Sequence, residues 1–297
     1  MSYSRRKTDL QVALARFLAK RSTAFRWRLG KLIGWLFFVL PNSRKRIARI
    51  NIKLCFPQLS ATERKQLLKR NLQSTGLGVM EMVSALWADH KAVEKSFTIS
   101  GLEQLEATLN KGRGCLLLSC HTTSIEWGIR GLNAVLHNQA LPVGHMLARQ
   151  HNNKLLEAHL EQARLAFVDK LIDKKNIRSL LASVQSGHPV YYAPDQNFSY
   201  QVRFSDFFGV PAATTTGTHK LASRGVPVIP WFCFRTSVGQ WHIEVLPEWV
   251  ELGQMDEQVA AQAINQLFEQ QINRYPDQYL WVHRRFKNQP KGQHSPY

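Results

Sequence analysis

Residues 114–120 read Gly-Cys-Leu-Leu-Leu-Ser-Cys, carry no charge, and run directly into His121 and the polar residues Thr122-Thr123-Ser124. A short apolar run of this kind is typical of a strand that is buried on both faces. The hydroxyls that follow suit the start of a helix, because Ser and Thr side chains accept hydrogen bonds from its unpaired N–H groups. The segment therefore predicts a buried strand that leads into a helix, the unit from which α/β sheets are built.

Strands and helices are expected to alternate over most of the chain after residue 96. Apolar runs predict strands at residues 97–100, 114–120, 141–147, 167–172, 189–193, 226–235 and 241–246. Helical periodicity predicts helices near residues 101–110, 124–137, 150–165, 174–186, 214–224 and 255–274. The last two strands follow each other closely and predict a hairpin. The expected fold class is therefore α/β, with a mixed central β-sheet flanked by helices.

The N-terminal residues 1–57 are expected to form a basic helical arm. They hold 14 Lys and Arg against the single acid Asp9, a net charge of +13 out of +18, so the other 240 residues carry only +5. Residues 32–40 form a nine-residue apolar run between basic flanks. This is shorter than the roughly 20 apolar residues that span a bilayer. The run predicts a helix lying in the membrane interface, with a buried core helix as the alternative.

The rest of the chain is expected to be one α/β domain at residues 58–287, followed by a disordered polar tail at 288–297. Ser60-Ala61-Thr62-Glu63 has the capping-box pattern and predicts a long helix to about residue 87. The four cysteines form no C-x-x-C pair and are expected to be buried and reduced. No H-E-x-x-H, P-loop or G-x-G-x-x-G pattern is present, so neither a metal nor a nucleotide cofactor is expected.

His121 follows the predicted buried strand at its carboxyl end, where ligands of α/β sheets collect, and Glu126 comes five residues later. Such a pair can perform general-base catalysis. Neutral His121 would accept a proton from a substrate hydroxyl, while Glu126 would bond the other ring nitrogen and stabilise the imidazolium. The activated alcohol would attack a thioester, so no nucleophilic serine is needed. The alternative is a histidine at a helix start and a glutamate that faces solvent.

Four more polar residues are candidates for a substrate site. Asp195 and Gln196 follow the strand predicted at 189–193, a position that suits a site residue and an ordinary Asx turn equally well. Arg149 and Arg164 can bind an anionic substrate or can be surface charges.

Two aromatic segments have two interpretations each. Residues 207–211, Phe-Phe-Gly-Val-Pro, can line an acyl pocket or contribute plain packing. Residues 281–287, Trp-Val-His-Arg-Arg-Phe-Lys, include Arg284 and mix basic with aromatic side chains. This mixture suits phosphate, lipid headgroups or nucleic acid, or else a solvated end of the chain.

Taken together, these segments resemble the late (secondary) acyltransferases of lipid A biosynthesis, within the lysophospholipid acyltransferase superfamily. The resemblance runs from about residue 30 to residue 287. The segments that carry it are Asn51-Ile52-Lys53-Leu54-Cys55-Phe56-Pro57, His121 with Glu126 as H-x4-E, Pro194-Asp195-Gln196, residues 207–211 with Thr214, and residues 281–287.

The resemblance implies transfer of a fatty acyl group from an acyl carrier protein thioester to a hydroxyl on a 3-hydroxyacyl chain of a lipid A precursor. His121 would be the base and Glu126 its partner, with Asp195 and Arg164 at the rim of the active site. Arg149, Gln196 and Arg284 are further candidates for substrate binding. The expected partners are acyl carrier protein, the acidic glycolipid and the cytoplasmic side of the inner membrane, with no cofactor.

Two other functions remain open on the sequence. One is an acyltransferase that acts on a lysophospholipid or another glycolipid with an acyl-CoA donor. The other is a non-enzymatic protein that binds membrane surfaces or nucleic acid through the basic arm and residues 281–287. Concentration of the charge in one arm, without an RNA-binding or helix-turn-helix signature, argues against nucleic acid as a partner.

Overall fold

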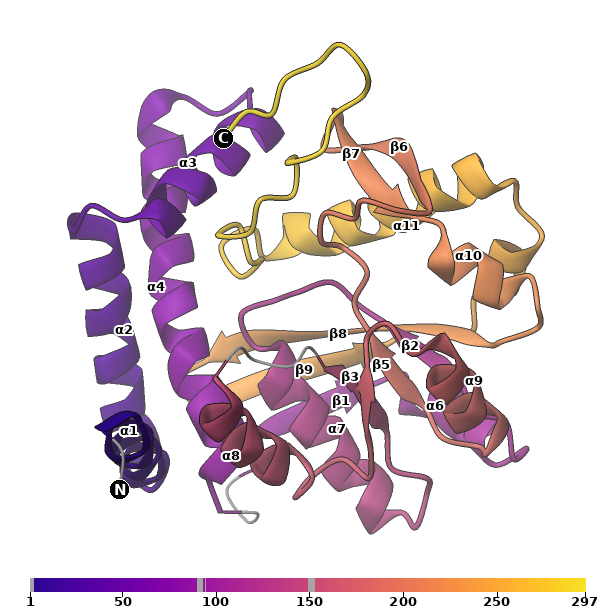
Figure 1. Ribbon diagram of the computed structural model, residues 1–297, viewed down its shortest axis with the longest axis horizontal. Coiled ribbons are helices and arrows are strands. Elements are labelled where there is room, and N and C mark those ends of the chain that lie inside the picture. The colour runs from indigo at the N-terminus through magenta and orange to yellow at the C-terminus, as the bar shows by residue number, and fades with distance from the viewer. Residues whose placement is uncertain (1–2, 90–92, 94, 149–152) are drawn as a thin grey trace.

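The computed structural model describes residues 3–89, 93, 95–148 and 153–297. A layer of N-terminal helices stands along one side of an α/β body (Figure 1). These helices are α1 (Tyr3–Ala19), α2 (Thr23–Val39), α3 (Ser43–Cys55) and α4 (Ala61–Trp87). The predicted helical arm and long helix are confirmed, and both hydrogen bonds of the capping box at Ser60 and Glu63 are formed.

The central sheet has seven strands in the order β1-β9-β8-β2-β5-β3-β4. Neighbouring strands are parallel except for the antiparallel β8-β9 hairpin, so the predicted mixed sheet and hairpin are confirmed. The strands are β1 (Phe97–Ser100), β2 (Leu116–Leu118), β3 (His145–Ala148), β4 (Leu171–Asp173), β5 (Val190–Tyr192), β8 (Val228–Ser237) and β9 (Gln240–Val245).

Helices cover both faces of this sheet, with α11 on one side and α7 on the other (Figure 1). The helices of the body are α6 (Leu102–Leu109), α7 (Ile125–Asn138), α8 (Lys154–Arg164), α9 (Ile177–Gln185), α10 (Gly217–Ala222), the 3₁₀ helix η1 (Val250–Gly253) and α11 (Glu257–Arg274). The alternating leucines of β2 divide between the two cores: Leu116 and Leu118 join one, and Leu117 joins the other. This explains the uninterrupted apolar sequence of the strand.

A second, two-stranded sheet was not predicted. It is the antiparallel hairpin of β6 (Val202–Phe207) and β7 (Val210–Thr215). Phe208 and Gly209 form its turn, both with positive φ, at 54° and 72°. Such a two-residue turn favours glycine, and Gly209 was the available signal for it. Phe207 is buried against the aromatic rings of Tyr279, Trp281 and Phe286, as the packing interpretation of residues 207–211 expects.

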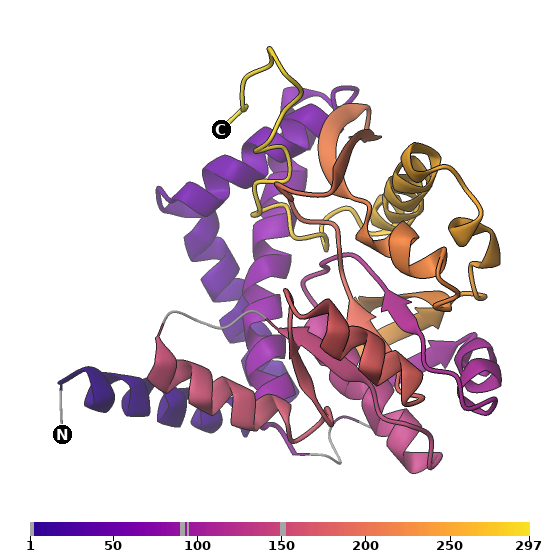
Figure 2. The ribbon, with the colours of Figure 1, turned by 45° about the vertical axis from the view of Figure 1, so that its right-hand side comes forward.

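The arm is packed against the body along one face and exposed along the other. Gly30 and Gly34 of α2 lie against Gly76 of α4, with the two backbones too close for a Cβ atom at Gly76. The opposite face of α2 exposes Leu32, Trp35, Leu36 and Val39, and the C-cap residue Leu40 is exposed as well. α1 lies beside α8 (Figure 2), where Asp9 and His159 approach to 3.7 Å. Over the described ranges, the helices all fall short of the length and apolar character needed to cross a membrane.

We expect Gly76→Ala to destabilise the protein, because the new methyl group would overlap the Gly30 carbonyl oxygen and the Gly34 backbone nitrogen. Overpacking of this kind costs about 1–3 kcal/mol. Helix propensity alone would favour alanine by about 1 kcal/mol, so the expected sign is opposite to the propensity effect. The free energy of unfolding in urea measures it.

Lys69→Ala is the matched control, since Lys69 lies on the exposed side of the same helix. Its free energy of unfolding should stay within about 0.5 kcal/mol of the wild-type value. Equal or greater stability of Gly76→Ala would show that α2 and α4 are not in close contact at these glycines.

Candidate active site

His121 and Asp195 leave neighbouring parallel strands at the same edge of the sheet. β2 and β5 are paired in register, with Leu118 opposite Tyr192. His121 lies three residues beyond the end of β2, and Asp195 lies three residues beyond the end of β5. The carboxyl ends of parallel strands meet at one edge, which is where α/β proteins place their ligands.

Asp195 holds His121 through two hydrogen bonds. The His121 Nδ1 atom lies 2.5 Å from Asp195 Oδ1, and the His121 backbone N–H donates to Oδ2 at 3.0 Å. The Asp195 side chain is only 2% exposed, whereas that of His121 is 29% exposed. The carboxylate therefore fixes the ring with the proton on Nδ1 and leaves the lone pair on Nε2. This is the protonation state that a general base requires.

The two groups shift each other's pKa in opposite directions. Burial lowers the pKa of His121, but the charge of Asp195 and its hydrogen bond outweigh burial and leave that pKa raised. Burial raises the pKa of Asp195, yet the His121 ring, the His121 backbone N–H and the Tyr279 hydroxyl together hold it well below its usual value. Asp195 is consequently ionised at neutral pH and stabilises the protonated form of His121.

The expected contact between Glu126 and the His121 ring is wrong. Glu126 lies in the first turn of α7 and pairs instead with Arg164 in the last turn of α8. Arg164 Nε donates to Glu126 Oε1 at 2.7 Å, and Nη2 lies 3.4 Å from Oε2. The spacing of residues in the sequence indicates only contacts between residues that are close along the chain. The residue that bonds the His121 ring is Asp195, which follows the adjacent strand β5.

The remaining candidates are dispersed. Gln196 contributes its backbone oxygen, which accepts from Arg285 Nη1 at 3.4 Å. Arg284 is exposed, and its guanidinium lies 5.9 Å from the centre of the Tyr297 ring. Arg149 lies outside the described residues. The structure thus brings Asp195 to His121 and Arg164 to Glu126, and it turns Arg284 toward the C-terminal residue.

The irregular segment after α11, residues 275–297, packs against the turn that carries His121, and we call it the C-terminal wall of the site. The His121 carbonyl accepts from Leu280 N at 3.0 Å, and the Gln278 carbonyl accepts from Thr123 N at 2.8 Å. Two buried amides of the N-terminal helices hold this segment. Asn51 Nδ2 donates to the carbonyls of Trp281 and His283, each at 2.7 Å, and Asn71 Nδ2 donates to those of Asp277 and Tyr279 at 2.9 and 2.7 Å.

Most of residues 281–287 pack into the core, so the interpretation of this segment as a solvated end of the chain is wrong for these residues. Arg284 and Lys287 remain exposed. Trp281, Arg285 and Phe286 are almost fully buried. Arg285 donates to Ala213 O at 2.8 Å and to Thr214 Oγ1 at 2.9 Å, which ties the segment to β7. In the tail at 288–297, which was expected to be disordered, the last residue is held against the body. The Tyr297 hydroxyl donates to Asn51 Oδ1 and accepts from Phe286 N.

Two residues near the His121–Asp195 pair were missed as individual candidates. The Tyr279 hydroxyl bonds Asp195. Burial lowers the pKa of His283 to about 4; Asp195 opposes this shift, while the charges of His121, Arg285 and Arg44 add to it. His283 is therefore neutral near the catalytic candidates. The sequence feature that could have indicated His283 as a site residue is its position within the basic and aromatic run at 281–287.

Residues of metal-ligating type also gather at the opposite edge of the sheet. Ligand atoms of His145, Asp169 and His188 all lie within 4.8 Å of one another. The two imidazole rings stack, with centroids 4.1 Å apart and 17° between their planes. Ring nitrogens bind metals in the plane of the ring, so one ion cannot suit both rings in this arrangement. This group also lies apart from His121, since His145 begins β3 and His188 precedes β5.

Comparison with known proteins identifies the family to which the sequence is similar. Residues 4–288 match the model of the bacterial lipid A biosynthesis acyltransferase family. The chain is 33% identical over 274 residues to the lipid A biosynthesis palmitoleoyltransferase of Escherichia coli (strain K12), covering 91% of this chain and 87% of that protein. It is 30% identical over 275 residues to the lipid A biosynthesis lauroyltransferase of the same strain, covering 91% and 88%.

A lipid A biosynthesis acyltransferase of Haemophilus influenzae is 32% identical over 270 residues, covering 88% of this chain and 84% of the relative. The similarity therefore extends over nearly the whole length of each protein and includes both the N-terminal helices and the C-terminal wall of the site. The chain belongs to the bacterial lipid A biosynthesis acyltransferase family.

Proposed function

We propose that the chain transfers a fatty acyl group from an acyl carrier protein thioester to a hydroxyl on a 3-hydroxyacyl chain of a lipid A precursor. The observation that carries this proposal is the His121–Asp195 pair, in which a buried carboxylate bonds Nδ1 and leaves Nε2 as the base. Family membership supports the class of substrate. No nucleophilic serine is needed, because the substrate alcohol is itself the nucleophile.

In the proposed reaction, His121 Nε2 accepts the hydroxyl proton while the alcohol oxygen attacks the thioester carbonyl. The tetrahedral intermediate then collapses, the carbon–sulfur bond breaks, and the departing thiolate takes the proton from the imidazolium. The product is an ester and a free thiol. Asp195 stays ionised throughout, and its charge stabilises the imidazolium while that ion exists.

The proposed role of Glu126 is to hold Arg164 rather than His121. Its two contacts occupy two of the five guanidinium N–H donors. The remaining donors suit a phosphate oxygen of the acceptor or the oxyanion that forms on the thioester carbonyl. Glu126 would thus act through Arg164, and the H-x4-E spacing would serve two separate functions.

The proposed partners follow from charge and exposed apolar surface. An acidic carrier protein and an acidic glycolipid would both be attracted to a chain of net charge +18. The outer face of α2 and the exposed Leu10, Leu14 and Phe17 of α1 suit the interface of the cytoplasmic side of the inner membrane. An acyl-CoA donor remains the alternative to the carrier protein.

The direct test is mass spectrometry of lipid A precursor after incubation with the protein and an acyl carrier protein thioester or acyl-CoA. We expect the wild type to add one acyl mass from the carrier protein, and His121→Ala to lose roughly 10²–10⁴-fold in kcat. The wild-type rate should rise with pH through a value above 6.5, because His121 must be neutral and its pKa is raised. In Asp195→Asn this rise should move to lower pH.

The shift in Asp195→Asn follows because only burial, which lowers the His121 pKa, would then act on the ring. A rise that stays at the same pH in Asp195→Asn would show that His121 is not the titrating base. Absence of acyl transfer from either donor by folded wild-type protein would exclude the proposed reaction, and transfer from acyl-CoA alone would exclude the carrier protein as donor.

A double-mutant cycle tests whether Glu126 acts through Arg164. We expect Glu126→Ala and Arg164→Ala each to lower kcat/KM roughly tenfold or more, because each leaves one largely buried charge unpaired. The double variant should be no worse than the poorer single variant. Combining Glu126→Ala with Asp195→Asn should instead multiply the two losses. Multiplied losses for Glu126 with Arg164, together with non-additive losses for Glu126 with Asp195, would indicate instead that Glu126 acts through His121.

Vesicle flotation tests the membrane surface. Trp35→Ala combined with Leu36→Ala should weaken binding to anionic phospholipid vesicles roughly tenfold or more, because less apolar surface would enter the interface. Val250→Ala with Val259→Ala is the control, since both valines are at least as exposed and lie far along the chain from the arm. Equal binding by both double variants would exclude α2 as the membrane-binding face.

A further inference from the structure

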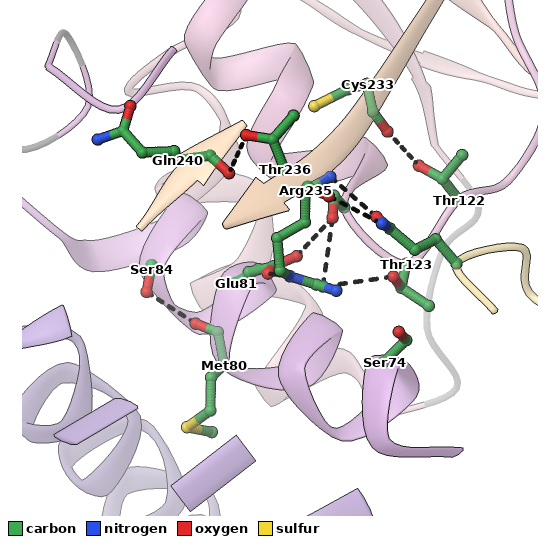
Figure 3. A network of polar contacts seen from close by, with 12 residues as sticks. Ser74, Met80, Glu81, Ser84, Thr122, Thr123, Cys233, Arg235, Thr236 and Gln240 are labelled. Atoms are coloured by element: carbon green, nitrogen blue, oxygen red, sulfur yellow. Dashed lines mark hydrogen bonds and ion pairs between the residues drawn. The ribbon is translucent and has the colours of Figure 1, made fainter. Parts of the chain in front are cut away.

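Glu81 is a buried carboxylate that lies outside the proposed proton-transfer machinery. It belongs to α4 and is 6% exposed. Arg235 Nε donates to Glu81 Oε1 at 2.5 Å (Figure 3). The Ser124 hydroxyl donates to Glu81 Oε2 at 2.7 Å. A buried charge is costly unless it is paired and hydrogen-bonded, and each oxygen of Glu81 has such a partner.

Arg235 extends this network to two further parts of the chain. It lies on β8, and its Nη2 atom is 3.4 Å from Thr123 Oγ1 (Figure 3). The same atom lies 3.4 Å from Ser124 Oγ. Its backbone N–H donates to Gln278 Oε1 at 2.8 Å, and its carbonyl accepts from Gln278 Nε2 at 2.9 Å. The network therefore joins α4, the turn after β2, β8 and the C-terminal wall of the site.

Ser124 occupies the N-cap position of α7 but makes no capping hydrogen bond with its side chain. A serine at this position ordinarily accepts from a backbone N–H of the first turn. Here its hydroxyl is fully buried and donates to Glu81. The Ser124 side chain therefore does not cap α7 but joins the turn to Glu81 of α4. This turn carries His121 at one end and leads to Glu126 at the other.

The approach of α4 to the same turn is unusually close. A Cβ atom at Gly78 would lie 2.5 Å from the Thr123 carbonyl oxygen, so only glycine fits there. Gly78 and Glu81 are three residues apart and share one face of the helix. One turn of α4 therefore contacts both Thr123 and Ser124, and the backbone of the turn has little room to move toward it.

We propose that Glu81 and Ser124 are positioning residues, which hold the turn between β2 and α7 and so fix His121 relative to the Glu126–Arg164 pair. Arg235 orients the carboxylate for this task. The inference rests on the proposed function, because it assigns a distance-setting role within that site. A buried ion pair is weak evidence for stability by itself, whereas its fixed hydrogen-bond geometry suits the setting of a position.

The effect on catalysis should be large compared with the effect on folding. A misplacement of about 1 Å can cost roughly 100-fold in rate. Ser124→Ala removes the contacts of the serine hydroxyl with Glu81 and Arg235 but leaves the Glu81–Arg235 pair and the His121–Asp195 pair in place. We expect this variant to fold normally and to lose roughly 10- to 100-fold in kcat, with KM for both substrates within about threefold of wild type. The pH at which its rate rises should stay unchanged.

Ser183→Ala is the matched control. Ser183 is another buried serine, and its hydroxyl donates to the Ser179 carbonyl within α9. It should retain the wild-type kcat. The conservative Glu81→Gln keeps an acceptor for Ser124 but weakens the pair with Arg235, so we expect a smaller loss. Adding Ser124→Ala to Glu81→Gln should then give no more than the loss of Ser124→Ala alone, because both act through one contact.

Hydrogen exchange gives a readout that does not depend on activity. Ser124→Ala should speed amide exchange in residues 119–128 and leave residues 189–193 of the neighbouring strand unchanged. Wild-type kcat in folded Ser124→Ala, or a loss of kcat that matches a loss of folded protein, would overturn the positioning role. If the wild type proves inactive on lipid A precursors, the proposed function fails, and unchanged exchange at 119–128 would overturn the positioning role separately.

Discussion

β2 is hydrogen-bonded along both edges, to β5 and to β8, and both pairings are parallel. Its three residues are fully buried, with side chains in the cores on both faces of the sheet. A slip of one residue would exchange the two faces and move the chain that follows, so burial fixes the register. The register therefore places His121 beside the end of β5, where Asp195 bonds its ring.

The N-terminal helices contribute to the site as well as to the outer surface. Residues 275–297 follow an irregular path, and their backbone groups need partners that a sheet would otherwise supply. Asn51 and Asn71 provide such partners from α3 and α4. The asparagine at the start of the 51–57 segment is therefore explained by the hydrogen bonds that its side chain makes to residues 281 and 283. The same helical layer that exposes apolar side chains on α2 therefore also holds the wall that contacts His121.

Local patterns predicted much of the fold. The capping box at Ser60 and the β8-β9 hairpin could be predicted because each depends on residues that are close in sequence. The hairpin in turn indicated that the sheet is mixed. The β6-β7 hairpin was missed, since its turn at Phe208-Gly209 was interpreted as part of an apolar segment. Burial of Arg285 was missed because a charged residue among other basic residues resembles a solvated end. Its partners on β7 are about 70 residues earlier in the chain.

The sequence by itself determined that His121 and Asp195 each follow a buried strand, and so that each lies at a carboxyl end. It did not determine that these two strands are neighbours, because strand order depends on crossovers and not on local propensity. Tertiary structure therefore decided that Asp195, 74 residues away, bonds the ring of His121, while Glu126, five residues away, turns to Arg164. Spacing along the chain limits which contacts can form, and packing of the sheet decides which of them do.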